Sequence, residues 1–255
     1  MAGESSLEVP MSTITSSTTV ADIATTDPAT IRVFQRLQID FCCGGKVPLA
    51  DVCRDRGLDS ASVLAELRAA GQEGDDGTDW RARPLIDLVT WIQSRFHERL
   101  REELPRLSKM LAKVIARHGD RLPETLRPLR STFDQLQTEL LEHMAKEDAV
   151  LFPAIVALES GAAAHAGPAS WEWLQQPIAV MEQEHDDAGA ALERIRRVTR
   201  NYTPPDWACP TFRGLYHGLL ELEQDMHEHV HLENNILFPR AATLARERSR
   251  RSNAL

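Results

Sequence analysis

Cysteines, long apolar runs and positive charge are all in short supply in this chain of 255 residues. Its four cysteines, at positions 42, 43, 53 and 209, do not have the spacing of a disulfide framework. No stretch approaches the roughly 18 consecutive apolar residues of a membrane-spanning helix, and the first residues lack the basic start and apolar core of a secretory signal. These absences predict a soluble, cytoplasmic protein in a reducing compartment, with no membrane partner.

The charge balance excludes another class of partner. Lys and Arg number 29 against 38 Asp and Glu, which gives a formal net charge of −9. Nucleic-acid binding requires an excess of Lys and Arg on some face, so we expect no nucleic-acid partner. The short basic run at 246–251 is typical of a solvated helix end. The rest of the composition is that of a globular protein, and the length suits two domains.

The N-terminal third divides into a tail, a small domain and a linker. Residues 1–17 are rich in Ser and Thr, which predicts a disordered tail. Residues 18–70 contain short helical segments separated by turn residues, and residues 71–83 have the glycines and acidic residues of a linker. Helix starts are marked by Asp27 with Pro28, by Pro48 and by Asp59, and helix ends by Gly57 and Gly71. We therefore expect a small all-helical domain at 18–70.

Residues 84–248 contain four long stretches with the apolar spacing of helices, which predicts a four-helix bundle and an all-α protein. The separating segments "RHGDRLPE", "ESGAAAHAGPASWEW" and "NYTPPDWACP" contain the Gly, Pro or Asn that end helices. On each stretch, polar side chains stand on the apolar stripe that should be buried. In the second stretch, for example, a stripe of leucines continues onto His143, Glu147 and Val150.

The chain also repeats itself. "HMAKEDAVLFP" at 143–153 aligns without gaps to "HVHLENNILFP" at 229–239, with five of eleven positions identical. A single stripe histidine precedes each copy, His97 by 46 residues and His185 by 44. The repeated unit is therefore a histidine followed by His-x-x-x-Glu. The six polar stripe residues are His97, His143, Glu147, His185, His229 and Glu233.

A metal site explains these six residues better than ordinary packing does. One histidine on an apolar stripe is usually a satisfied core residue, and we keep that interpretation for His118, His165, His217, His227 and His231. For the six stripe residues, the same interpretation would bury two carboxylates beside four imidazoles. No Lys or Arg on the stripes compensates the carboxylate charges, so this burial would cost several kcal/mol. A bound cation would compensate the carboxylate charges. Residues four apart lie about 6 Å apart along one face of a helix, so each His-x-x-x-Glu offers an imidazole and a carboxylate to the same volume. The pattern predicts a His4Glu2 metal site.

The ligand set favours two iron ions. Six ligands of this kind are too many for one zinc ion and suit two metals bridged by the carboxylates. The absence of thiolate and the presence of carboxylate favour iron or manganese. With two histidines each and both glutamates bridging, each iron has four protein ligands. That leaves room for an oxo or hydroxo bridge and for O2, NO or water.

The histidine repeat resembles a hemerythrin-like four-helix bundle. Together with the N-terminal "IDFCCGG…LADVC", residues from about 18 to 245 closely resemble the di-iron iron–sulfur cluster repair proteins, a bacterial group linked to recovery from nitric oxide and oxidative stress. The resemblance places the iron ligands of that family on the same six residues. Oxygen-carrying hemerythrins have a fifth histidine and a different final carboxylate spacing, with Asp. This chain has no stripe residue for the fifth ligand, which argues against reversible O2 carriage.

This resemblance implies repair of iron–sulfur clusters damaged by nitric oxide or oxidative stress. The chain would supply iron to damaged iron–sulfur proteins, as a stoichiometric donor rather than a turnover enzyme. Two alternatives use the same site: an NO- or O2-binding hemerythrin-like sensor, and a di-iron NO reductase or peroxidase. The client proteins, the electron donor and the oligomeric state, a homodimer included, stay open.

The stretch "DFCCGG" at 40–45 is a second candidate site. Cys42 and Cys43 are not needed as bundle ligands, and with Cys53 ten residues on they do not match a Cys-x-x-Cys zinc spacing. A vicinal disulfide, simple burial and reactive thiols all stay open for the pair, whereas we expect Cys53 to be a buried apolar residue. Backbone N–H groups near the double glycine would lower a thiol pKa. We predict that at least one of the pair is reactive, as an iron acceptor, a redox couple or a docking contact.

Overall fold

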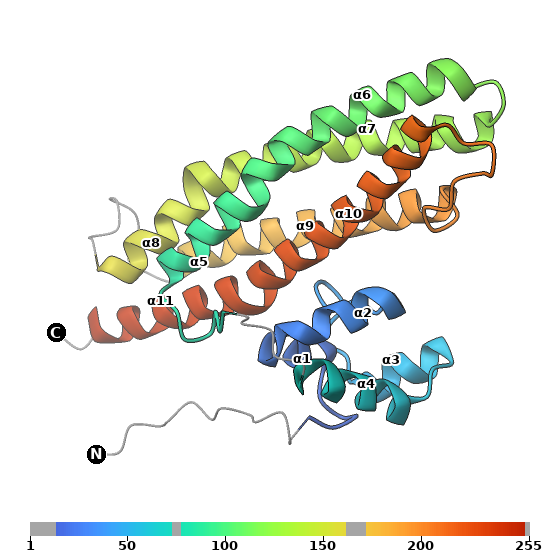
Figure 1. The fold of residues 1–255 in the computed structure, drawn as a ribbon. Coiled ribbons are helices and arrows are strands. Elements are labelled where there is room, and N and C mark those ends of the chain that lie inside the picture. Colours follow the sequence, from blue (N-terminus) through green and yellow to red (C-terminus); the bar gives the residue numbers. More distant parts are fainter. Residues whose placement is uncertain (1–13, 73–77, 162–171, 253–255) are drawn as a thin grey trace. The chain divides into compact units, whose positions relative to one another are not determined.

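The computed structural model describes residues 14–72, 78–161 and 172–252 of the chain. Two compact units make up the chain, Met1–Ala82 and Arg83–Leu255. All regular elements in the described ranges are helical, which confirms the predicted all-α fold (Figure 1). Most of the expected tail, at 1–13, and the middle of the expected linker, at 73–77, lie outside the described residues.

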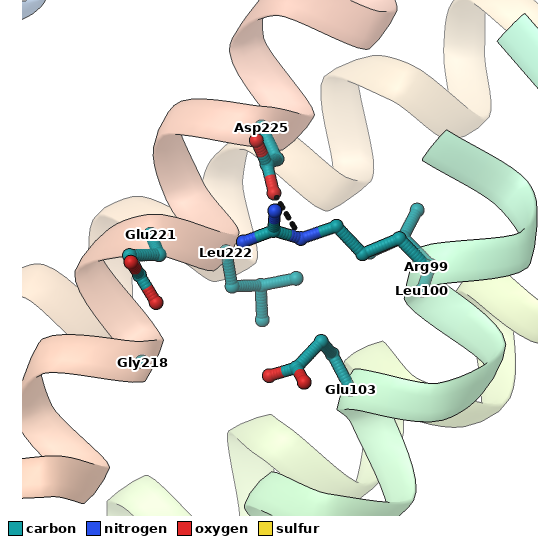
Figure 2. Close-up of a pocket in the computed structure, with 7 residues that line it drawn as sticks. All are labelled: Arg99, Leu100, Glu103, Gly218, Glu221, Leu222 and Asp225. Atoms are coloured by element: carbon teal, nitrogen blue, oxygen red, sulfur yellow. Dashed lines mark ion pairs between the residues drawn. The ribbon is translucent and has the colours of Figure 1, made fainter. Parts of the chain in front are cut away.

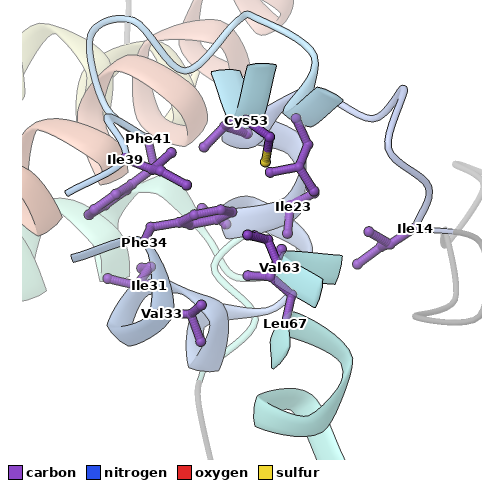
Figure 3. Close-up of a cluster of buried hydrophobic side chains, with 13 residues drawn as sticks. Ile14, Ile23, Ile31, Val33, Phe34, Ile39, Phe41, Cys53, Val63 and Leu67 are labelled. Atoms are coloured by element: carbon purple, nitrogen blue, oxygen red, sulfur yellow. The ribbon is translucent and has the colours of Figure 1, made fainter. Parts of the chain in front are cut away.

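The N-terminal unit contains short helices around one apolar core. They are α1 (Val20–Thr26), the 3-10 turn η2 (Pro28–Thr30), α2 (Ile31–Leu37), α3 (Leu49–Arg56) and α4 (Ser60–Gln72). Phe34 and Phe41 stack at 6.1 Å in the centre of this core, which Figure 3 shows with Cys53 and Leu67 at its edges. Ile14 is 1% exposed and belongs to the same core, so ordered structure begins before the predicted start at residue 18.

The turn residues act largely as their chemistry dictates. The Asp27 side chain accepts a hydrogen bond from Ala29 N, and Gly57 ends α3 in the left-handed region at φ 66°. Asp59 accepts from Ser62 N at the start of α4. The predicted helix end at Gly71 is wrong, because α4 continues through this residue to Gln72. A single glycine near a helix end is tolerated at a cost of only about 1 kcal/mol.

The second unit contains four long helices that run side by side (Figure 1). Three of them are each interrupted by one π-helical turn. The first comprises α5 (Leu85–Ile92), η3 (Gln93–His97) and α6 (Glu98–His118); the second α7 (Pro123–Lys146), η4 (Glu147–Leu151) and α8 (Phe152–Ser160); the third α9 (Glu172–Val198); and the fourth α10 (Pro210–Leu232), η5 (Glu233–Leu237) and α11 (Phe238–Ser252). Helix α7 packs against α9, and α10 against α6.

The π turns change the register of the buried stripe. A π turn contains one more residue than an α turn, so the side chains that follow it shift by one position. After Glu147, Leu151 is buried at 2% exposure, whereas Val150 is 55% exposed. The prediction that Val150 continues the buried stripe is therefore wrong. The leucines and Phe133 ahead of this turn are buried, as predicted.

Within the three described ranges, no helix combines the length and the apolar character needed to cross a membrane.

Candidate metal centre

All six polar stripe residues lie together in the interior of the bundle. Each is at most 3% exposed, although each carries an ionisable side chain. Three of them coincide with π turns: His97 ends η3, Glu147 begins η4 and Glu233 begins η5. Single π turns inside α-helices are frequent at functional sites, because they redirect side chains without ending the helix.

The six residues form two groups that share both glutamates. His97 and His229 form one group with Glu147 and Glu233, and His143 and His185 form the other with the same two glutamates. In each group the potential ligand atoms lie within 4.8 Å of one another. We call these groups the His97–His229 half and the His143–His185 half. Glu147 and Glu233 therefore lie within reach of the ligand atoms of both halves.

Outward hydrogen bonds fix the direction of three imidazoles. His97 Nδ1 donates to Asp148 Oδ1 at 3.0 Å, and Asp148 is also bound by Arg101 and Gln93. Because Nδ1 is occupied on the outside, Nε2 faces the interior as a lone-pair donor to a cation.

The other half has two such partners. His143 Nδ1 donates to Glu184 Oε2 at 2.8 Å, and Lys146 pairs with the same carboxylate. His185 Nδ1 donates to Asn234 Oδ1, also at 2.8 Å. Both Nε2 atoms are then acceptors, yet they lie 3.0 Å apart. Two lone pairs facing each other at this distance are stabilised by a cation that both can bind.

The carboxylates show the same need for a cation. Both oxygens of Glu147 and Oε2 of Glu233 are fully buried without a hydrogen-bond partner. Ring nitrogens of His97, His143 and His185 lie between 3.1 and 3.4 Å from these oxygens, but without hydrogen-bond geometry. Unpartnered buried carboxylate oxygens are costly, so this donor set fits a divalent metal.

The pKa values agree with a negatively charged pair of carboxylates. Burial opposes ionisation of Glu233, but the contacts with His229 and His185 outweigh it and hold its pKa well below the usual range. Burial likewise disfavours protonated His143, yet the charge of Glu147 raises the pKa of this imidazole to about 9. Both shifts show that imidazolium and carboxylate stabilise each other in this cluster, and a metal cation bound there would replace the protons on the imidazole Nε2 atoms.

A small recess lies beside this centre, between α6 and α10 (Figure 2). It measures about 10 Å³, and charged side chains line it, among them Arg99, Glu103 and Asp225. Asp225 pairs with Arg99 and with Arg95, each at 3.0 Å. Asp225 and Glu103, two carboxylates that line the recess, are both paired with arginine, so the recess does not itself have the chemistry of a metal site.

The double-cysteine turn is organised by Asp40. Its carboxylate accepts hydrogen bonds from the backbone N–H groups of Cys42, Cys43 and Gly44, and from the Cys42 thiol at 3.3 Å. Cys42 is buried, and Cys43 is half-buried. The hydrogen bond with Cys43, burial and the charge of Asp40 raise the pKa of the Cys42 thiol well above its ordinary value. The expectation that backbone N–H groups lower a thiol pKa is therefore wrong for Cys42, because Asp40 occupies those groups.

Among the described residues, the remaining cysteines and histidines belong to neither metal group. Cys53 is 1% exposed in the N-terminal core, which confirms the expectation of a buried apolar residue. His231 is buried and contacts Asn235, and His217 is exposed beside Glu221. Residue 165 lies outside the described residues.

Reasoning from the stripes missed the outer partners of the histidines. Asp148 follows Glu147 in the sequence, Asn234 follows Glu233, and Glu184 precedes His185. In a regular α-helix, a residue next to a ligand points about 100° away from it. The available signal was the polar neighbour at equivalent places in the repeat, Asp148 in one copy and Asn234 in the other.

Comparison with known proteins agrees with this architecture. Residues 88–241 match the family described as Hemerythrin HHE cation binding domain, and residues 16–71 match one described as Domain of Unknown function (DUF542). The chain belongs to the family of hemerythrin HHE proteins that contains the iron–sulfur cluster repair protein YtfE. YtfE of Yersinia pseudotuberculosis is 42% identical over 214 residues, which cover 84% of this chain and 91% of that protein. YtfE of Yersinia pestis is 41% identical with the same coverage.

Proposed function

We propose that this chain binds two iron ions with His97, His143, Glu147, His185, His229 and Glu233, and delivers iron to damaged iron–sulfur clusters. The observation that carries the proposal is the pair of buried His/Glu groups with shared glutamates. The relatives that span most of this chain are named iron–sulfur cluster repair proteins. Bound iron would then be the cargo of the protein, and Glu147 and Glu233, which belong to both groups, would be ligands to both ions.

The ligand chemistry supports delivery rather than permanent storage. Imidazole and carboxylate ligands of iron can be displaced by competing ligands. The thiolates of an iron–sulfur protein are softer ligands than either, and they can take up the iron that is released. Glu147 and Glu233 each face both halves, so each carboxylate keeps one ion when the other leaves. The centre therefore releases iron without leaving an unpaired buried carboxylate.

The first experiment counts iron in the anaerobically purified full chain. We expect about two irons per chain, in keeping with two ligand groups that share their glutamates. His143→Ala and Glu233→Ala should each lose most of this iron, because each removes a donor that the groups depend on. His217→Ala is the matched control, since His217 is exposed, pairs with Glu221 at 3.6 Å and belongs to neither metal group. Full iron retention in both ligand variants would refute the site.

The second experiment tests repair itself. Iron-loaded protein is added to an enzyme whose iron–sulfur cluster has been nitrosylated, and recovery of enzyme activity is compared with that given by the same amount of free iron. Recovery above free iron, saturating near the amount of iron carried, supports a stoichiometric donor. Multiple turnovers of NO or peroxide with an electron donor would instead establish the reductase or peroxidase alternative. Spectral changes with NO and no recovery would establish the sensor.

Cys42 and Cys43 enter the proposal as the thiols that act on the client or on released iron. Cys43 is the accessible member, because Cys42 is 6% exposed and its thiol donates to Asp40. We expect native protein to be alkylated at Cys43 well before Cys42 or Cys53. A Cys42→Ala, Cys43→Ala variant should bind iron normally and repair clusters poorly. Normal repair by this variant, with both thiols resistant to alkylation, would remove the cysteines from the mechanism. Because free thiols persist in reducing compartments, we place the protein in the cytoplasm.

A further inference from the structure

The two halves of the metal centre are not equivalent, although the sequence repeat makes their ligands equivalent. In the repeat, His97 corresponds to His185 and His143 to His229. His97 and His185 both have an outward partner one residue after a glutamate, Asp148 and Asn234 respectively. Up to this point the two copies match.

The difference lies one residue before the single stripe histidines. Glu184 precedes His185 and binds His143 Nδ1 at 2.8 Å. Phe96 precedes His97 at the equivalent place and stacks on His229 at 5.2 Å with an interplanar angle of 7°. A phenyl ring accepts no Nδ1–H hydrogen bond of this kind, and His229 Nδ1 is buried without a hydrogen-bond partner. Phe96 thus replaces the outward acceptor that His143 has.

Each outward acceptor strengthens the ligand that it holds. It fixes the tautomer and the orientation of the imidazole and raises its basicity, and its loss typically lowers metal affinity about 10- to 100-fold. In the His143–His185 half both histidines have such a partner, whereas in the His97–His229 half only His97 does. The recess between α6 and α10 also lies on the His97–His229 side, since Leu100 follows His97 by one turn and Asp225 precedes His229 by one turn (Figure 2).

We infer that the ion in the His97–His229 half is the exchangeable one, and that the ion in the His143–His185 half is retained. The inference rests on the proposed two-iron site and adds which ion is delivered. Asn234, Glu184 and Asp148 act as positioning residues, because each acts through a ligand histidine. Phe96 determines the asymmetry.

Release kinetics test the inference directly. The full chain is loaded anaerobically with two Fe2+ ions, mixed with excess ferrous chelator, and the absorbance of the chelate is followed. Two phases of equal amplitude are expected, one ion in each. Asp148→Asn should accelerate the fast phase alone, because it weakens His97. Asn234→Ala and Glu184→Gln should each accelerate the slow phase, by about 10- to 100-fold.

Asn235→Ala is the matched control for Asn234→Ala, since the adjacent asparagine contacts His231, which belongs to neither metal group. Both phases should keep their wild-type rates in this control. Glu184→Gln serves as the second variant should Asn234→Ala not fold, because the Glu184 side chain is 28% exposed. Two ions that leave in a single phase, or a slow phase that responds to Asp148→Asn, would overturn the inference. A chain that binds fewer than two ions would instead refute the proposed site.

Discussion

Asp40 holds the turn that carries the adjacent cysteines, because its one carboxylate accepts hydrogen bonds from three successive backbone N–H groups. The double glycine makes this wrapping feasible. A Cβ on Gly45 would lie 2.7 Å from the carbonyl oxygen of Phe41, which a substituted residue could not approach without moving backbone. The turn therefore depends on Asp40 for its hydrogen bonds and on Gly45 for space.

Replacing Asp40 should loosen this turn. Asp40→Ala leaves the three N–H groups to water and removes the Asp40 acceptor of the Cys42 thiol, so we expect a loss of about 1 kcal/mol, as for a lost helix cap. Cys42 should also become alkylated faster, as measured by peptide mapping after brief exposure to iodoacetamide. Asp55→Ala is the control, because Asp55 is exposed and pairs with Arg54, away from the double-cysteine turn in the sequence. Unchanged Cys42 labelling in Asp40→Ala would show that burial alone protects this thiol.

Among single residues, the sequence pattern indicated the six central residues but not the hydrogen-bond partners of their histidines. A histidine or glutamate on an apolar stripe is conspicuous, because burial without a partner is costly. Asp148, Glu184 and Asn234 lie off the stripes, where polar residues are ordinary. The roles of Asp148 and Asn234 depend on the direction of side chains in π turns, and the role of Glu184 depends on the packing of α9 against α7; residue spacing alone predicts neither.

At the scale of the helices, the bundle depends on the close approach of α6 and α10. A Cβ at Gly218 would lie 2.7 Å from Cδ2 of Leu107, and Leu107 is fully buried. The two helices approach each other closely because Gly218 has no side chain. This contact lies on the side of the bundle that carries His97 and His229.

Substituting Gly218 tests this close approach. An exposed glycine in a helix gains about 1 kcal/mol on change to Ala, but at Gly218 the clash with buried Leu107 should reverse the sign. We expect Gly218→Ala to lower the free energy of unfolding in urea by at least 1 kcal/mol. Gly189→Ala in α9 is the matched control, because no atom lies within 4 Å of its added Cβ, and it should stabilise. Stabilisation by both changes would mean that α6 and α10 separate freely.

The π turn in the second helix reverses which side chain is expected to stabilise the core, from Val150 in the sequence pattern to Leu151 in the structure. Since Leu151 is buried and Val150 is exposed, Leu151→Ala should cost about 2–5 kcal/mol, and Val150→Ala less than about 0.5 kcal/mol. Chemical denaturation of the two variants measures the difference. Equal costs, or a larger cost at Val150, would contradict the π-shifted register.

On the scale of the whole molecule, the chain has two compact units, and both metal groups found among the described residues lie in the second. The sequence places a linker at 71–83, because its glycine and acidic residues interrupt the apolar pattern on both sides, and the boundary between the two units falls after Ala82. It did not predict that Ile14 belongs to the N-terminal core, since one apolar residue in a Ser- and Thr-rich stretch has no periodic pattern around it.

Iron should therefore stabilise one unit selectively. A ligand at 100 times its dissociation constant adds about 2.7 kcal/mol to the state that binds it, so iron should raise the unfolding temperature of the bundle and leave the N-terminal unit unchanged. Four of the five tryptophans, at 91, 171, 173 and 207, lie in the second unit, and their fluorescence reports on it. Alkylation of buried Cys53 reports on the first.

The comparison uses the full chain with and without Fe2+ under anaerobic conditions, heated in parallel for both measurements. Glu233→Gln is the control, because it keeps the shape of the bridging side chain and removes the charge that binds both ions. In this variant the tryptophan transition should no longer respond to iron. If iron shifts the Cys53 transition by the same amount as the fluorescence transition, the two units unfold cooperatively, and stability is transmitted from the metal centre to the cysteine-bearing domain.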